Sequence, residues 1–166
     1  MLNILITVLL VACTASTNWL TYTDNVNHFS FSYPDKWSKR MGANTIGFLS
    51  PKEGEKDKFQ ENVGLMLQDL SQQPMNLEGY TELTKKQIVA NLGESAIISL
   101  KSTTLAGQQT KEFIYNMNYQ GKSLKIKQYW FIKGNVAYLF TYTAEPSEYD
   151  KYESTATEMI KSFKFF

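Results

Sequence analysis

Four long strand-like segments in the second half of the chain constrain its fold most strongly. They cover residues 94–105, 109–119, 122–133 and 136–143. The breaks between them are short and contain glycine: Ala106-Gly107, Gln120-Gly121 and Gly134-Asn135. Two-residue loops of this kind join antiparallel neighbours, because glycine adopts a positive φ without steric cost. The pattern predicts an antiparallel meander. Its last strand is apolar on both faces, so we expect both faces of the sheet to be covered.

Shorter strands are predicted in the first half of the chain. Phe29, Phe31 and Tyr33 alternate with serines, which is the period of a strand with one buried face. Residues 19–23 would pair with this strand, and apolar runs at 45–49 and 62–70 have the length of further strands. The charged stretch 51–61 between those two runs is interpreted as a solvated loop rather than a Ca²⁺ site, because its lysines would repel a cation.

Two helices complete the predicted fold. The first has Asn76 as its N-cap, an apolar face at helical spacing from Leu77 to Leu92, and Gly93 at its end. The second follows Pro146, where Ser147 and Asp150 resemble a capping box. Its buried stripe would consist of Tyr149, Tyr152, Ala156, Met159, Ile160 and Phe163. The fold class is therefore α+β: an antiparallel sheet of about 6–8 strands with helices on its faces, in one domain from 19 to 166.

Composition removes several classes of function. The chain of 166 residues carries 17 basic and 16 acidic side chains, so it has no strong field to collect nucleic acid. A single cysteine and a single histidine, His28, exclude an internal disulfide, a CxxC pair and multi-histidine metal sites. We find no P-loop, dinucleotide-binding or nucleophile-elbow motif. The sequence thus predicts a protein that is not an enzyme and uses no metal or cofactor, with His28 as a structural or surface residue.

The first 23 residues carry no charged side chain, and the mostly apolar run Leu2–Ala12 has the length of a signal-peptide core. It is too short to span a bilayer, which takes about 20 apolar residues. The run ends in Leu10-Val11-Ala12-Cys13, which resembles the site where bacterial lipoproteins are cleaved and acylated. We therefore predict that 1–12 is a lipoprotein signal peptide, Cys13 carries palmitate-type acyl chains, and 14–18 is a short tether. The alternatives are a buried N-terminal strand or helix with an inert core cysteine, or a reactive thiol.

One strand of the meander has an unusual row of side chains. The row consists of Lys125, Lys127, Tyr129, Phe131 and Lys133, which share one strand face. In one interpretation a helix covers the two aromatic residues while the lysines reach solvent at the rim. In the other, the row is an exposed basic and aromatic patch that docks a protein partner or anionic lipid.

Two stretches of the sequence resemble the PsbP family. The first is a strand ending in Tyr33-Pro34-x-x-Trp37, and the second is the closing hairpin and helix that end in Ser162-Phe163. The resemblance covers roughly residues 19–166. It implies an α/β/α sandwich around an antiparallel sheet, and a role in binding rather than catalysis. It carries no catalytic motif, and no local match supports the metal positions of photosynthetic members.

Together these features predict a monomeric accessory module, held to a membrane of the bacterial cell envelope with its domain outside the cytoplasm. Its partner would be an envelope protein that the sequence does not identify. The alternative is an envelope hydrolase or small-ligand carrier, which would need a pocket between the sheet and a helix.

Overall fold

A computed structural model describes residues 17–166 of the chain. The predicted signal peptide, Cys13 and residues 14–16 of the predicted tether lie outside the described residues. Among the residues that are described, no helix combines the length and apolarity needed to cross a membrane.

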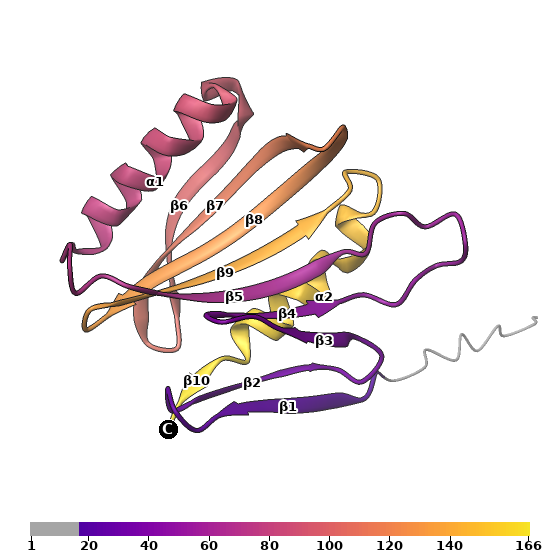
Figure 1. Cartoon of the computed structure of the whole chain (residues 1–166), viewed down its shortest axis with the longest axis horizontal. Helices are drawn as coiled ribbons and strands as arrows, with labels where there is room; N and C mark the ends of the chain where they lie inside the picture. The colour runs from indigo at the N-terminus through magenta and orange to yellow at the C-terminus, as the bar shows by residue number, and fades with distance from the viewer. Residues whose placement is uncertain (1–16) are drawn as a thin grey trace, which may run out of the picture.

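The predicted meander forms one half of a seven-stranded antiparallel sheet (Figure 1). Its strands are β6 (Ile97–Leu105), β7 (Gln108–Tyr119), β8 (Lys122–Lys133) and β9 (Val136–Ala144). At two of the tight turns both central residues have positive φ: Ala106 and Gly107 at 50° and 74°, and Gln120 and Gly121 at 50° and 78°. This conformation matches the twist of the flanking strands, so the meander prediction is confirmed.

The other half of the sheet comes from the first part of the chain. β5 (Asn62–Asp69) pairs along its whole length with β9, and β4 (Thr45–Leu49) and β3 (Ser38–Met41) follow outward. The full strand order is β3-β4-β5-β9-β8-β7-β6. The sequence did not predict β3, whose four residues include Lys39 and Arg40.

A second, three-stranded sheet has the order β1-β2-β10. β1 (Trp19–Asp24) and β2 (Phe29–Pro34) form the expected hairpin, whereas β10 (Lys164–Phe165) was not predicted. A strand of two residues shows no periodicity, and β10 exists because Phe165 pairs with Phe29, far away in the chain. The separation into two sheets is therefore a tertiary feature.

The helices lie close to their predicted positions. α1 (Leu77–Leu92) is capped by Asn76, whose side chain accepts a hydrogen bond from the Gly79 N–H at 2.8 Å. A 3₁₀ turn, η1 (Glu94–Ala96), follows where the first meander strand was expected to begin. α2 (Tyr149–Lys161) starts after Glu148, which makes no side-chain capping bond, so the predicted capping box at Ser147 is wrong.

Two hydrophobic cores lie on opposite faces of the large sheet. α1 covers one face, where Trp130, Phe113 and Tyr80 are buried. α2 and the small sheet together cover the other face, where Phe131, Phe140 and Met159 are buried (Figure 1). Neighbouring residues such as Trp130 and Phe131 enter different cores because successive strand side chains alternate between faces. The α+β class with helices on both faces is confirmed.

Candidate functional site

The described chain begins beside a pocket, with the last two residues of the predicted tether. The Asp35 N–H donates a hydrogen bond of 2.9 Å to the Asn18 carbonyl, which holds the start of β1 against the end of β2. The pocket has a volume of about 470 Å³ and is lined by Thr17, Asn18, Pro34, Asp35, Lys36, Trp37, Pro51, Lys151, Tyr152 and Thr155. Trp37 is buried in its wall and meets Tyr152 edge to face, with ring centroids 5.9 Å apart. The Tyr-Pro-x-x-Trp motif thus joins the end of β2 to α2.

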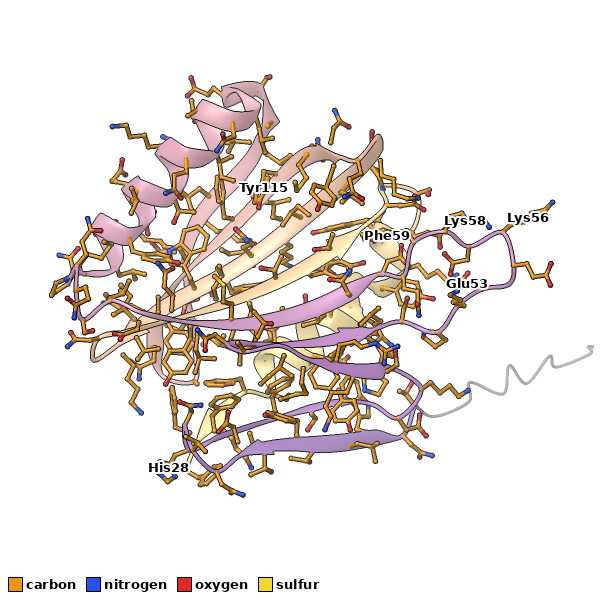
Figure 2. The ribbon with its side chains drawn as sticks, in the orientation of Figure 1. His28, Glu53, Lys56, Lys58, Phe59 and Tyr115 are labelled. Atoms are coloured by element: carbon orange, nitrogen blue, oxygen red, sulfur yellow. The ribbon has the colours of Figure 1, made fainter. Side chains whose placement is uncertain are left out.

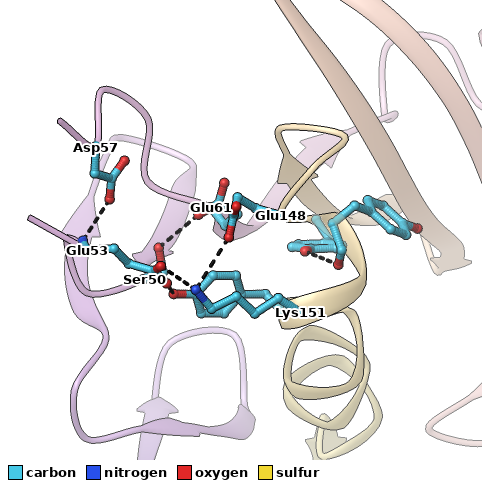
Figure 3. A network of polar contacts seen from close by, with 9 residues as sticks. Ser50, Glu53, Asp57, Glu61, Glu148 and Lys151 are labelled. Carbon is cyan, nitrogen blue, oxygen red and sulfur yellow. Dashed lines mark hydrogen bonds and ion pairs between the residues drawn. The ribbon is translucent and has the colours of Figure 1, made fainter.

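The charged loop 51–61 is docked onto the first turn of α2 rather than fully solvated (Figure 3). Glu53 accepts hydrogen bonds from the Lys151 ammonium and the Tyr152 hydroxyl. These bonds, that from Lys151 first, lower the pKa of Glu53 below its ordinary value. Lys56 points into solvent at the tip of the loop (Figure 2). The Lys58 ammonium folds back and donates a hydrogen bond of 3.2 Å to the Glu55 carbonyl. Within residues 17–166 no group of three or more acidic, histidine or cysteine side chains is arranged to hold a metal ion.

Glu61 closes the base of that loop, and no sequence motif pointed to its role. Its side chain is 3% exposed, and the Ser50 hydroxyl donates to Oε2 at 3.4 Å. The backbone N–H of Ser50 also donates to the Glu61 carbonyl at 2.8 Å. Burial raises the pKa of Glu61 above its ordinary value. The partners of Glu61 join the two ends of one loop, so we interpret it as a structural residue.

A helix covers the two aromatic residues of the row on β8, as the first interpretation requires, but it also covers Lys127, which that interpretation placed at the solvent-exposed rim. α2 packs over the row, so Tyr129 is 6% exposed, Phe131 is fully buried and Lys127 is 7% exposed. The five residues of the row do not form one continuous exposed patch. The reason is tertiary: the buried stripe of α2 and the small sheet occupy the face on which these side chains lie.

Lys127 is held in a charged network beneath α2. Its ammonium lies 2.5 Å from Glu153 Oε1, 3.3 Å from the Thr157 hydroxyl and 3.9 Å from Glu112 Oε2. A second cation, Lys101, lies 2.8 Å from the other oxygen of Glu112. The hydrogen bond from Lys127 lowers the pKa of Glu153. Burial alone would raise the pKa of Glu112, but hydrogen bonds, that of Lys101 first, bring it below its ordinary value.

Tyr129 adjoins the same network. Burial first, and then its hydrogen bond to Glu112, raise the pKa of this tyrosine far above its ordinary value. The hydroxyl therefore stays protonated throughout the physiological range and acts as a donor. The cations and carboxylates under α2 satisfy one another, so this region stabilises the docking of the helix.

The two ends of the row remain accessible. The Lys125 ammonium lies 3.8 Å from the centroid of the Tyr149 ring, and the Lys133 ammonium 3.5 Å from that of Phe165. Lys125 is partly exposed and Lys133 is exposed. Each end of β8 therefore presents a cation stacked on an aromatic ring, separated by the covered middle of the strand.

His28 lies at the β1–β2 turn, as a surface residue (Figure 2). Its backbone has a positive φ of 53°, and its ring meets Phe166 edge to face at 6.0 Å. The backbone carbonyl of His28 accepts a hydrogen bond from the Phe166 N–H at 3.1 Å. The residue therefore fixes the C-terminal strand to the hairpin.

A second hollow lies between the end of α1 and the large sheet, the type of position that the carrier hypothesis requires. It has a volume of about 610 Å³ and is lined by Asn91, Leu92, Ser95, Ala96, Asn116, Met117, Asn118, Ser123, Leu124 and Pro146. None of these side chains is charged. The sequence did not predict this site, because its walls come from α1, η1, β7, β8 and the loop before α2.

Comparisons with known proteins agree with this architecture. The model of the family described as PsbP matches residues 17–165. The solution structure of cyanobacterial PsbP, CyanoP, from Synechocystis sp. PCC 6803 aligns with a TM-score of 0.65 at 13% identity, covering 93% of this chain and 96% of that one. The protein PA94 from Pseudomonas aeruginosa aligns with a TM-score of 0.63 at 14% identity, covering 87% of this chain and 94% of its own.

A third similar structure is that of LpqN, described as involved in cell envelope biogenesis of Mycobacterium tuberculosis. It aligns with a TM-score of 0.56 at 11% identity, covering 92% of this chain and 86% of that one. At these identities the three structures establish a shared fold. Among functionally curated proteins, none matches this chain.

Proposed function

Because the chain belongs to the PsbP family, we propose that it is a non-catalytic binding module, held at a membrane of the bacterial cell envelope by lipid on Cys13. The observation that carries the proposal is where the fold begins. β1 starts at Trp19, and the preceding residue, Asn18, is already bonded to Asp35. Five residues after Cys13 span at most about 18 Å, so an acylated cysteine would keep the domain close to the membrane surface.

Two further observations support this proposal. The resemblance to PsbP implies binding rather than catalysis, and the structurally similar LpqN is described as involved in cell envelope biogenesis. Inside the domain, the buried charges of Lys127 and Glu112 are paired with each other and with Glu153 and Lys101 at the edge of the buried region, which is the arrangement of a structural network.

The cations at the two ends of β8 are the members of the predicted patch that an envelope partner could reach. Lys125 and Lys133 are available to the acidic side chains of a protein, whereas Lys127, Tyr129 and Phe131 would be reached only if α2 were displaced. A test of this surface should therefore leave Lys127 unchanged, because its substitution would disturb the fold.

The test of the tether is Cys13→Ser, compared with Thr14→Ala as a matched control in the same segment. We expect wild type and Thr14→Ala to incorporate labelled palmitate and to lose residues 1–12. Cys13→Ser should incorporate no label and remain an uncleaved precursor, because serine supplies no thiol for acylation. Mass spectrometry of the N-terminus and metabolic labelling give the result. Persistent labelling, or a mature N-terminus at another residue, would overturn the tether.

The partner arm of the same experiment uses crosslinking in living cells. The double variant Lys125→Glu/Lys133→Glu should lose its crosslinked envelope protein while still unfolding in one cooperative thermal transition, shifted only by the loss of its two cation–π contacts. Lys85→Glu/Lys86→Glu, which reverses two charges on α1, serves as the control and should retain the crosslink. An unchanged crosslink in the first variant would rule out the ends of β8 as the contact surface.

A further inference from the structure

β7 continues beyond the point where its outer neighbour begins. The first pair between β6 and β7 joins Ile97 to Tyr115. Residues 116–119 of β7 pair only with β8, from Asn116 opposite Lys125 to Tyr119 opposite Lys122. In an antiparallel pair, alternate residues point their N–H and C=O groups away from the partner strand. The outer side of residues 116–119 is therefore a short strand edge with open backbone donors and acceptors.

The chain before β6 does not extend the pairing along this edge. η1 (Glu94–Ala96) connects α1 to β6, and the Ala96 N–H donates to the Gly93 carbonyl at 3.2 Å within this turn. In Figure 1 the end of α1 and the β7–β8 turn lie at the same end of the large sheet. The strand edge thus faces the end of a helix across the hollow of about 610 Å³ described above.

The walls of the hollow are neutral. Asn91, Ser95 and Asn118 supply amide and hydroxyl groups, while Leu92, Met117 and Leu124 supply apolar surface. Amides both donate and accept, so they suit a main chain or an uncharged polar side chain. No lining side chain carries a charge that would pair with a charged group of a ligand.

We propose that this hollow binds an extended, uncharged segment of a partner protein, which adds as a short strand along residues 116–119 of β7. The proposal rests on the proposed function as a binding module and names the chemistry of the partner. Four residues of edge extend over about 14 Å, which gives room for a ladder of a few main-chain hydrogen bonds. The segment is internal to its own chain, because a terminal carboxylate or amine would bring a charge into neutral walls.

A peptide fits this site better than a sugar or another small molecule for a geometric reason. The open donors and acceptors of a strand edge repeat at every second residue, and the main chain of a second strand has the same repeat. The groove between strand edge and helix end then holds alternate side chains of the bound segment, which is how strand addition gains specificity.

The experiment uses the full chain, purified in detergent, and a displayed library of hexapeptides that contain no acidic, basic or histidine residues. The best binder is synthesised with both ends capped, and its affinity is measured by calorimetry. We expect binding to protect backbone amides within residues 116–119 from hydrogen exchange. Every second residue of the bound peptide would donate its N–H to β7. N-methylation of these residues should weaken binding at least tenfold, because it removes the donors of the ladder. N-methylation of the intervening residues should have a smaller effect.

Three variants locate the site. Ser95→Trp and Asn91→Trp fill the hollow from two different elements, η1 and α1, and each should weaken peptide binding at least tenfold. Ser154→Trp, on the exposed side of α2, is the matched control and should bind as wild type does. Thermal unfolding identifies any variant that fails to fold, and the other blocking variant then decides the result.

Several outcomes would overturn the proposal. They are a library that yields no binder, a binder unaffected by both blocking variants, and equal affinity after methylation of either set. Protection of residues 116–119 in a self-associated protein without peptide would assign the edge to a second copy instead. Lipid labelling at Cys13 and crosslinking through Lys125 and Lys133 do not involve this hollow. A failure here is therefore distinguishable from a failure of the proposed function.

Discussion

The lysines of the β8 row show that burial decides whether a charged side chain is part of the fold or is accessible to a partner. Lys127 is identical in type to Lys125 and Lys133 and shares their strand face, yet α2 covers it alone of the three. A buried cation is tolerated because Glu153, Glu112 and Thr157 surround it. The sequence identified the row correctly, but it could not say which members would be exposed, because that depends on the position of α2.

We predict that Lys127→Met destabilises the fold by about 2 kcal/mol, since it leaves Glu112 without one of its cations and Glu153 without its partner. The value is below the ~3–5 kcal/mol of fully buried pairs because part of Glu153 is exposed to solvent. Chemical unfolding at neutral pH measures the change. Lys86→Met, at an exposed position of α1, should stay within about 0.5 kcal/mol of wild type. Equal effects of the two substitutions would contradict the network.

The same variant should change the pH dependence of stability. The lowered pKa values of Glu153 and Glu112 mean that their contribution is complete above the ordinary value of 4.5 and is lost as pH falls through the lowered pKa. Without Lys127 both pKa values move upward. The part of the stability that is lost on acidification should therefore be smaller in Lys127→Met than in wild type, because folded-state pKa values closer to the unfolded ones make stability depend less on pH. Unfolding titrations towards acidic pH measure the difference.

For helices and strands, local sequence signals predicted that an element exists more reliably than they predicted the residues at which it begins and ends. The two-residue turns with glycine located three hairpin connections, because a positive φ is a requirement that few residues meet. The N-cap of α1 was also correct. The start of α2 was not, since a capping motif acts only if the backbone places its side chain at the first turn.

These two helix starts give a matched pair of substitutions. We predict that Asn76→Ala lowers the free energy of unfolding by about 1 kcal/mol, because the Gly79 N–H loses its acceptor. Ser147→Ala should have an effect near zero, because no hydrogen bond from this side chain caps α2. Denaturant unfolding of the two variants beside wild type checks the difference. Similar losses in both would show that the capping assignments are incorrect.

For the whole molecule, one aromatic residue connects layers that are distant in sequence. Phe163 follows α2, and its ring centroid lies 5.2 Å from that of Phe29 in the small sheet and 5.2 Å from that of Phe140 in the large sheet. It also lies 5.8 Å from Phe131, beneath α2. The side chain therefore fills the space where the helix and both sheets meet.

We predict that Phe163→Ala destabilises the protein by about 4 kcal/mol, because it removes a buried aromatic ring and leaves a cavity between three elements. Phe166→Ala is the matched control, since that ring is 61% exposed, and its effect should stay within about 0.5 kcal/mol. Thermal unfolding and denaturant titration measure both. A small effect of Phe163→Ala would mean that the two sheets do not depend on this contact.

The sequence by itself determined the local elements: the meander, the first hairpin, both helices and the apolar stripes that cover the sheet. Each rests on signals within a few residues, such as side-chain periodicity, glycine in turns and a capping asparagine. Only the tertiary structure decided that β10 joins β2 in a second sheet and that α2 buries the middle of the β8 row. The same holds for the end of β7, which extends beyond its pairing with β6 beside a neutral hollow. These features depend on contacts between distant residues, whose energies no local pattern contains.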